Sequence, residues 1–527
     1  MTRVLRSLAV ISLLAVGLTA GGCDLTELNT NPNAATNAEP GELLTNAQLD
    51  LASTYWKDYP GGFWMRYAQH LTTNQYTDAD RFAFPDRRTS SNNGNWTDMY
   101  YILNDLQEII RQNRRSPGDV DGYGPNANQI AIAKILQAWT YQVMTDTWGP
   151  VPFTESLKGQ DTGNFRPGYT GQQQIYTALI DSLSAASNMI QTGSPALATG
   201  DLIYGGDMSN WKAFANALKM RVAMRMSDQM PQAAATAIDE AIQAGAFESN
   251  AQSAVIPFGS SSPYTNPIWA NYEISGRDDW AAPQALVGVM NANEDPRRRA
   301  FFSDADADSA GNQFNGFPYG LSQGDAQSLF TDPDRDFSRP GPRVISRPTE
   351  PAILMLHDEV LFIKAEAALR SDMNVPSISQ SAEQLYRDAI TASANHWTGD
   401  IVPAATDSEI NTLLSNLDMP GDSGFDLEQD LGVQKWIAQY MQGIQGWSTW
   451  RRMDFQGVLQ VPPGNPGQTN FGKQIAVRMV YPTDESTLNS ENLNDAINNL
   501  LGGNGAADTQ GTLLWWDTEY QPTDPDL

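Results

Sequence analysis

Apolar residues recur at helical spacing in several segments of the chain. The segment 96–114 carries an apolar stripe that includes Trp96 and Ile110. The segment 128–145 is apolar almost all round. Because 3.6 residues make one helical turn, the first pattern predicts an amphipathic helix and the second a buried helix. The same spacing predicts further helices at 171–190, 211–222, 233–244, 353–367, 381–394 and 430–443.

The middle of the chain has a different character. From 247 to about 349, Pro, Gly, Ser and Asp recur and no long helical period survives, and the part from Gly457 is again rich in loops. A compact domain rarely carries so long an irregular stretch without a function for it, so we expect a ligand-binding face here. No segment alternates like a long strand. The pattern therefore predicts a mainly α fold, in which paired helices form a scaffold for large loops.

The N-terminus carries the pattern of a targeting segment. Arg3 and Arg6 precede an apolar run from Leu8 to Leu18, and small residues then lead to Cys23, the only cysteine. The run is far shorter than the roughly 20 residues that cross a bilayer, so it predicts a signal peptide over 1–22.

The position of Cys23 resembles the lipobox of bacterial lipoproteins. The resemblance implies that Cys23 is lipidated, becomes the mature N-terminus and tethers the protein to a membrane face. An ordinary signal peptide with a chance cysteine is the alternative. Residues 23–39 are polar and rich in Asn, Thr and Pro, which predicts a tether. We expect 40–527 to form a single domain that meets the membrane only through its lipid.

The chain is strongly acidic, and this limits its partners. It has 61 acidic residues against 33 Lys and Arg, for a formal net charge of −28. Such a surface repels phosphate backbones, so we expect no nucleic-acid binding. With one cysteine, no disulfide can form within the chain, and packing must hold the fold together.

No familiar catalytic pattern is present in the sequence. His70, His357 and His396 lie far apart and lack metal-ligand spacing, and there is no GxSxG, P-loop or dinucleotide-binding motif. The only thiol is assigned to the anchor. Paired carboxylates remain open, because so many acidic residues always allow some pair. We therefore expect a binding protein rather than an enzyme, and no cofactor beyond a possible structural calcium.

One acidic loop is a candidate calcium site. Asp304, Asp306 and Asp308 alternate as the ligands of a calcium loop do. The EF-hand pattern fails, because Ser309 stands in place of the turn glycine and Asn315 in place of the bidentate glutamate. A solvated acidic loop is the alternative.

Aromatic residues give the strongest local signal of a ligand site. Flat rings stack on the apolar faces of sugars, while carboxylates, amides and guanidinium groups pair with their hydroxyls. The alternative is that such rings pack long loops against the helices. The residues that make up this candidate site are Tyr264, Trp269, Tyr272, Arg277, Asp278 and Trp280.

Several segments together resemble the SusD/RagB-type nutrient-binding outer-membrane lipoproteins, particularly the SusD-like branch. They follow one another in the expected order over nearly all of the mature chain. They are 29–32 (NTNP), 146–152 (DTWGPVP), 200–207 (GDLIYGGD) leading into Trp211, 216–221 (NALKMR), 295–297 (DPR), Glu359 with 365–367 (AEA), 434–436 (QKW), 451–452 (RR) and 478–482 (RMVYP). We expect Glu359 and Glu366 to pair with basic neighbours such as Arg451 or Arg452.

The resemblance implies a fold of tetratricopeptide-like helix pairs with a loop-built ligand face. It also implies a cell-surface lipoprotein that covers a SusC-like TonB-dependent transporter and delivers oligosaccharides or peptides to it. The family's ligand residues carry no transferable motif, so the aromatic cluster rests on the local argument alone. A peptide binder of the same type and a protein-interaction scaffold remain open. If the cluster is not the site, we expect the ligand face around Trp56 to Tyr76.

Overall fold

The structure, a computed structural model, describes residues 38–56, 62–84, 88–305, 313–463, 475–502 and 507–519. The chain divides into two units, Met1–Glu39 and Pro40–Leu527, and all described helices and strands belong to the second. Cys23 lies outside the described residues, so its lipidation stays a prediction. None of the described helices has both the length and the apolar character that a bilayer crossing requires.

The protein is mainly α, as predicted, and consecutive helices pack against one another. In the first half, α7 packs against α5 and α9, and α10 packs against α9 and α11. In the second half, α17 packs against α18. The long helices are α2 (Pro40–Trp56), α5 (Thr89–Arg115), α7 (Asn126–Trp148), α9 (Gln172–Met189), α10 (Met208–Arg225), α11 (Pro231–Ala244), α17 (His357–Leu369) and α18 (Ala382–Trp397).

Local signals explain where several of these helices begin and end. The Asp207 carboxylate accepts hydrogen bonds from the backbone N–H groups of Ser209 and Asn210 at the start of α10. Ser381 does the same for Gln384 at the start of α18. These side chains satisfy backbone donors that have no partner within the helix. Gly245 has a φ of +89°, a conformation that favours glycine, and it ends α11.

Two predicted helices have different boundaries in the structure. The run that begins near Ile353 is first a strand, β6 (Ala352–Met355), and the helix starts only at His357. All four residues of β6 are buried, so apolar spacing alone cannot distinguish this strand from a buried helical turn. The predicted helix at 430–443 is interrupted. It consists of η4 (Leu427–Leu431), α20 (Gly432–Ala438) and a break, after which α21 (Gly443–Met453) begins.

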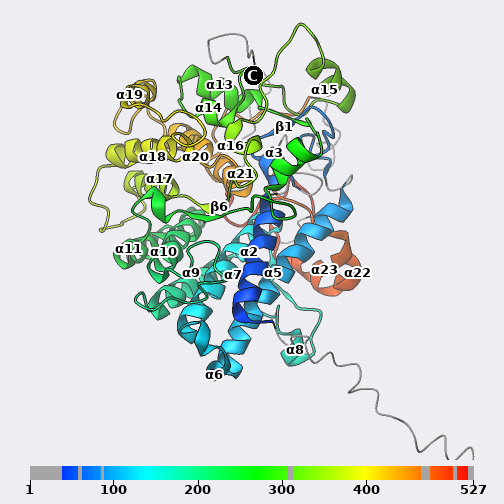
Figure 1. Cartoon of the computed structure of the whole chain (residues 1–527), viewed down its shortest axis with the longest axis vertical. Helices are drawn as coiled ribbons and strands as arrows, with labels where there is room; N and C mark the ends of the chain where they lie inside the picture. Colours follow the sequence, from blue (N-terminus) through cyan, green and yellow to red (C-terminus); the bar gives the residue numbers. More distant parts are fainter. Residues whose placement is uncertain are drawn as a thin grey trace, which may run out of the picture. The chain divides into compact units, whose positions relative to one another are not determined.

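In the described part of the irregular central stretch the helices are all short, as its composition predicts. They are η2 (Asn250–Gln252), α12 (Pro267–Trp269), η3 (Ala270–Ile274), α13 (Gln284–Ala292), α14 (Arg298–Phe301), α15 (Gln323–Phe330) and α16 (Pro342–Ile345). Figure 1 shows α13, α14, α15 and α16 gathered at one end of the second unit, with α6 (Pro117–Val120) and α8 (Gly159–Thr162) at the other.

The remaining elements are equally short. The remaining helices are α3 (Trp64–Tyr67), η1 (Asp121–Tyr123), α19 (Asp407–Ser415), α22 (Thr483–Leu488) and α23 (Ser490–Asn499). Because α22 and α23 lie after Gly457, that part of the chain is less irregular than its composition predicts. The antiparallel strand pairs are β1 (Thr72–Thr73) with β5 (Trp280–Ala281), β2 (Val151–Pro152) with β3 (Tyr169–Thr170), and β4 (Ala254–Ile256) with β6.

The helices share one large apolar core, and buried ion pairs join them across it. Glu359 on α17 pairs with Arg221 on α10 at 2.6 Å, and not with Arg451. Glu366 pairs with Arg452, as predicted, and with Lys435 at 3.2 Å. Arg221, Glu359 and Glu366 are at most 2 % exposed. The two glutamates of the sequence motif therefore hold helices together and do not face solvent.

Candidate functional site

A buried two-stranded ribbon brings two distant segments together, and the residues just beyond its end reach the surface. β1 and β5 pair so that Thr72 lies opposite Ala281 and Thr73 opposite Trp280. The backbone N–H of Asn74 continues this ladder by donating to the Asp279 carbonyl at 3.0 Å. Extending the same register places Tyr76 opposite Arg277. The Arg277 guanidinium carbon does lie over the Tyr76 ring, 5.2 Å from its centroid.

Tyr76 is held in an unusual backbone conformation. Its φ is +56°, in the left-handed region that L-residues with large side chains rarely adopt. Its backbone N–H donates to the side-chain oxygen of Gln323 on α15 at 2.7 Å, and its side chain is 36 % exposed. Conformations of this kind cost free energy and cluster at functional sites, where the surrounding structure maintains them.

A second arginine is fixed next to this ribbon. Arg339 lies over the Phe330 ring at 4.9 Å and donates to both carboxylate oxygens of Asp278 at 2.7–2.8 Å. Half-buried Tyr272 belongs to the same neighbourhood, since the charges of Asp278 and Arg339 both act on its hydroxyl. Burial raises the pKa of this hydroxyl most, Asp278 raises it further, and Arg339 lowers it. We call this surface the aromatic–arginine face. It consists of Tyr76, Arg88, Tyr272, Arg277, Asp278, Phe330 and Arg339.

The three arginines of the face are matched by three aspartates. Arg339 pairs with Asp278 at 2.7 Å, Arg277 pairs with Asp279 at 2.9 Å, and Arg88 pairs with Asp78 at 3.2 Å. Arg88 also approaches the Tyr76 ring, at 5.9 Å from its centroid. Counted together with these three aspartates, the arginines of the face carry no formal charge in excess, although the whole chain carries −28.

This arrangement suits a polar, uncharged ligand that has apolar patches. Partly exposed rings offer flat apolar surface, and fixed guanidinium and carboxylate groups offer donors and acceptors beside them. The arginines are held by ion pairs and by the rings they stack on, so few rotamers are lost when a ligand binds.

The structure places the six sequence-predicted ligand residues in different environments. Tyr272, Arg277 and Asp278 belong to the aromatic–arginine face. Trp280 is 1 % exposed within β5, so the prediction that its ring is a platform for the ligand is corrected: the ring packs in the core. The sequence shows that a large ring is present at this position, but the strand β5 directs the ring into the core.

Tyr264 and Trp269 remain candidate ligand residues, but no described contact joins them to the aromatic–arginine face. Tyr264 is 58 % exposed, and Trp269 is half-buried at the end of α12. No hydrogen bond, ion pair or ring contact in the described ranges joins either of them to the aromatic–arginine face. Asn266 fixes the start of α12, where its side-chain oxygen accepts from the N–H groups of Ile268 and Trp269.

Part of the face was not predicted from the sequence. Tyr76 is the last residue of the segment Trp56 to Tyr76, which the sequence indicates as the alternative position of the ligand face. In the structure this segment and the aromatic cluster meet at one ribbon. Arg88, Phe330 and Arg339 were not predicted. Their only local signal is an arginine or aromatic in a loop-rich segment, and the partners that give them a role are distant in sequence.

The candidate calcium loop is only partly described. Asp304 accepts a hydrogen bond from the Gln313 backbone N–H at 3.2 Å, whereas Asp306 and Asp308 lie outside the described residues. Among the residues that the structure does describe, no three His, Cys, Asp or Glu side chains are grouped so as to hold a metal ion. A structural calcium in this loop stays a prediction.

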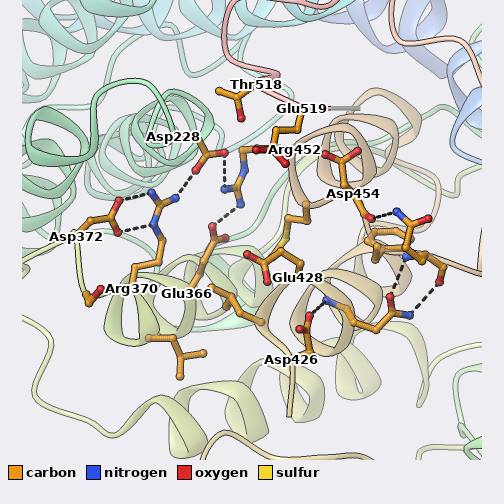
Figure 2. Close-up of a pocket in the computed structure, with 17 residues that line it drawn as sticks. Asp228, Glu366, Arg370, Asp372, Asp426, Glu428, Arg452, Asp454, Thr518 and Glu519 are labelled. Atoms are coloured by element: carbon orange, nitrogen blue, oxygen red, sulfur yellow. Dashed lines mark hydrogen bonds and ion pairs between the residues drawn. The ribbon is translucent and has the colours of Figure 1, made fainter. Parts of the chain in front are cut away.

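A pocket of about 900 Å³ lies elsewhere on the second unit. Figure 2 shows it lined by carboxylates and two arginines, with Arg370 and Arg452 tied to Asp228, Asp372 and Glu366. Its one aromatic lining residue, Phe455, is 1 % exposed. The pocket therefore lacks the exposed ring that a sugar site requires, and we place the candidate site on the aromatic–arginine face.

The second unit is thus a scaffold of paired helices that carries a partly exposed face of rings and ion-paired arginines. The sequence matches the SusD-like family model, described as starch-binding and associating with the outer membrane, over residues 32–482. The chain belongs to this family. No curated protein sequence matches the chain significantly.

Solved structures agree with this fold. A chitin-binding protein has 23 % sequence identity and a TM-score of 0.76, with 91 % of this chain and 100 % of that one covered. A chitin-binding SusD homolog from Flavobacterium johnsoniae has 22 % identity and a TM-score of 0.70, with 91 % and 99 % covered. A SusD-like protein from Bacteroides thetaiotaomicron has 21 % identity and a TM-score of 0.72, with 91 % and 100 % covered.

Proposed function

We propose that the protein is a lipid-anchored, cell-surface binding protein that captures neutral oligosaccharides on its aromatic–arginine face. The observation that carries this proposal is the β1–β5 ribbon, which holds Tyr76 and Arg277 together at the surface of a SusD-like scaffold. Two similar structures are described as chitin-binding, and the family description names starch. Both are neutral sugar polymers.

The pairing of charges favours a neutral sugar over an acidic one. A uronate or sulfate group would meet arginines that already have aspartate partners, at 2.7–3.2 Å. It would also approach a chain with a net charge of −28. Both effects oppose an anionic ligand, whereas hydroxyl groups can share the fixed donors and acceptors without displacing an ion pair.

An array of neutral oligosaccharides, uronate-containing oligosaccharides and peptides tests the proposed ligand class. We expect the purified protein to retain neutral oligosaccharides, and to leave them chemically intact after prolonged incubation. Selective retention of peptides or of uronates would contradict the proposal, and so would steady release of shorter sugars.

We propose further that the captured oligosaccharide passes to a SusC-like TonB-dependent transporter. The support is family membership together with the predicted lipid anchor. Affinity purification of the tagged protein from detergent-solubilised outer membranes tests the partnership. We expect one large β-barrel transporter to copurify in near-equal amount. Recovery of the protein alone, under mild detergent and at low salt, would contradict it.

A further inference from the structure

A small buried cavity lies among α10, α17, α20 and α21. It offers about 10 Å³ of space for the centre of a water-sized particle, which is enough for one small species. None of its lining residues belongs to the aromatic–arginine face. The lining consists of Arg221, Met224, Arg225, Glu359, Ile363, Lys435, Thr449 and Arg452.

Two arginine donors at this cavity lack partners. The Nη1 atoms of Arg221 and Arg225 are buried, and neither finds a hydrogen-bond acceptor among the described residues. The two side chains are 2 % and 5 % exposed. A buried donor without an acceptor costs about 1–3 kcal/mol, and more when it is charged, so an unassigned acceptor between them is expected on energetic grounds.

The other polar groups of the lining are already engaged, and positive charge predominates among them. Glu359 accepts both of its close hydrogen bonds from Arg221, at 2.6 and 2.7 Å. The Thr449 hydroxyl donates to Gln439 at 2.6 Å. Lys435 and Arg452 both pair with Glu366, and Arg452 also pairs with Asp228 at 3.5 Å. Four cationic side chains thus line the cavity, and one carboxylate does.

Arg225 is the least compensated of the four cations. Its nearest carboxylate oxygen, on Asp146, is 3.7 Å from Nε, and its Nη2 donates to the neutral Gln445 at 2.9 Å. Burial lowers the pKa of neighbouring Lys435; Glu366 and Glu359 oppose this shift, while Arg452 and Arg225 add to it. Arg225 is therefore the cation of the lining that has no carboxylate within hydrogen-bonding distance.

We propose that this cavity binds a monatomic anion, with chloride as the expected occupant, held between the Nη1 groups of Arg221 and Arg225. A water molecule would also accept from these donors, but it brings two O–H groups that need acceptors of their own. A chloride ion only accepts, and its charge would compensate that of Arg225, which has no close carboxylate partner. Both donors belong to α10, and the ion would lie where this helix faces α17, α20 and α21.

Anomalous diffraction tests the proposal on the unmodified protein. Crystals grown with sodium bromide in place of sodium chloride are measured at the bromine absorption edge. We expect an anomalous peak in the cavity, within hydrogen-bonding distance of both Nη1 atoms. Density without an anomalous signal, as a water molecule would give, would overturn the proposal.

A melting experiment tests the same site in solution. At equal ionic strength, chloride should raise the melting temperature by about 1–3 °C over gluconate, which is too large for the cavity. Arg225→Gln should abolish this difference, whereas Arg387→Gln on the exposed surface of α18 should keep it. Equal melting temperatures of the wild type in the two salts would contradict the proposal, whether or not the Arg225 variant folds.

Discussion

At the scale of single residues, the candidate site depends on exposed side chains that ion pairs and ring contacts fix in place. Tyr76 combines a left-handed backbone, an exposed ring and two neighbouring guanidinium groups. Trp280, only a few residues along the partner strand, has the same aromatic character but is buried. The two residues therefore have separable roles, one toward a ligand and one toward the fold.

Truncation of the Trp280 side chain should make the folded protein less stable. We expect Trp280→Ala to lower the free energy of unfolding by about 3–5 kcal/mol, because a fully buried indole leaves a cavity. Trp269→Ala should cost less, since Trp269 is only half-buried. Denaturant titration followed by circular dichroism measures both. A Trp280 variant as stable as the wild type would show that its ring does not pack in the core.

Acid should destabilise the protein partly through His70. The imidazole is fully buried, its Nε2 lies 3.1 Å from the Trp436 carbonyl, and burial lowers its pKa to about 3. Between pH 6.5 and 3 the unfolded chain therefore binds a proton at His70 that the folded protein does not. Stability from this residue is complete above pH 6.5 and decreases as the pH falls, by about 2 kcal/mol at pH 5.

The variant His70→Gln isolates this contribution from those of other buried groups. Asp358 acts in the opposite sense, because burial raises its pKa to about 7. We expect the wild type to lose about 2 kcal/mol more than the variant between pH 7.5 and pH 5, measured by urea titration at each pH. Parallel losses in the two proteins would exclude His70 as the cause.

At the scale of elements, close backbone contacts fix how the short helices meet. Gly443 begins α21 at its contact with α3, where an added Cβ would lie 2.4 Å from the backbone of Trp64 and Met65. Backbone atoms cannot give way as a flexible side chain can. A glycine is therefore needed at this contact for packing, although its position in a helix disfavours it.

Gly443→Ala should destabilise the protein by roughly 1–3 kcal/mol, because α21 must shift away from α3. Gly288→Ala in α13 is the matched control. A Cβ added at Gly288 would have no atom within 4 Å, so this change should be neutral or stabilise by up to about 1 kcal/mol. The midpoints of urea unfolding distinguish the two. Equal midpoints would mean that α21 and α3 are not held by this contact.

The helical scaffold was predictable from the sequence because periodicity is a local property. Segments such as 128–145 and 171–190 differ from α7 and α9 by a few terminal residues. β6 was missed because a fully buried strand and a buried helical turn share the same apolar composition. Arg339 was missed for another reason. Its role depends on Asp278, which is 61 positions away, and no local pattern encodes that pairing.

At the scale of the whole molecule, the protein consists of a helical body and a predicted lipid anchor. The body belongs to a family that associates with the outer membrane, and the described helices include none that could cross a bilayer. Attachment through Cys23, which lies outside the described residues, stays a prediction from the sequence.

Cys23→Ala should release the protein from membranes. Several acyl chains give stable anchoring, and the substitution removes the atom that would carry the lipid. We expect the wild type to sediment with outer membranes and to incorporate labelled palmitate, and the variant to do neither. The tested protein needs its signal peptide intact. A variant that still sediments and still incorporates palmitate would contradict the anchor.

The central claim is that the aromatic–arginine face binds a neutral oligosaccharide, and calorimetric titration of Tyr76→Ala tests it most directly. The titrant is the neutral oligosaccharide that the array selects. The control is Tyr101→Ala, which removes a ring that is 66 % exposed on α5, outside the face. We predict that Tyr76→Ala weakens binding about 10- to 100-fold at nearly unchanged melting temperature, and that Tyr101→Ala binds like the wild type. Wild-type affinity in the folded Tyr76→Ala variant would contradict the assignment of the site to this face.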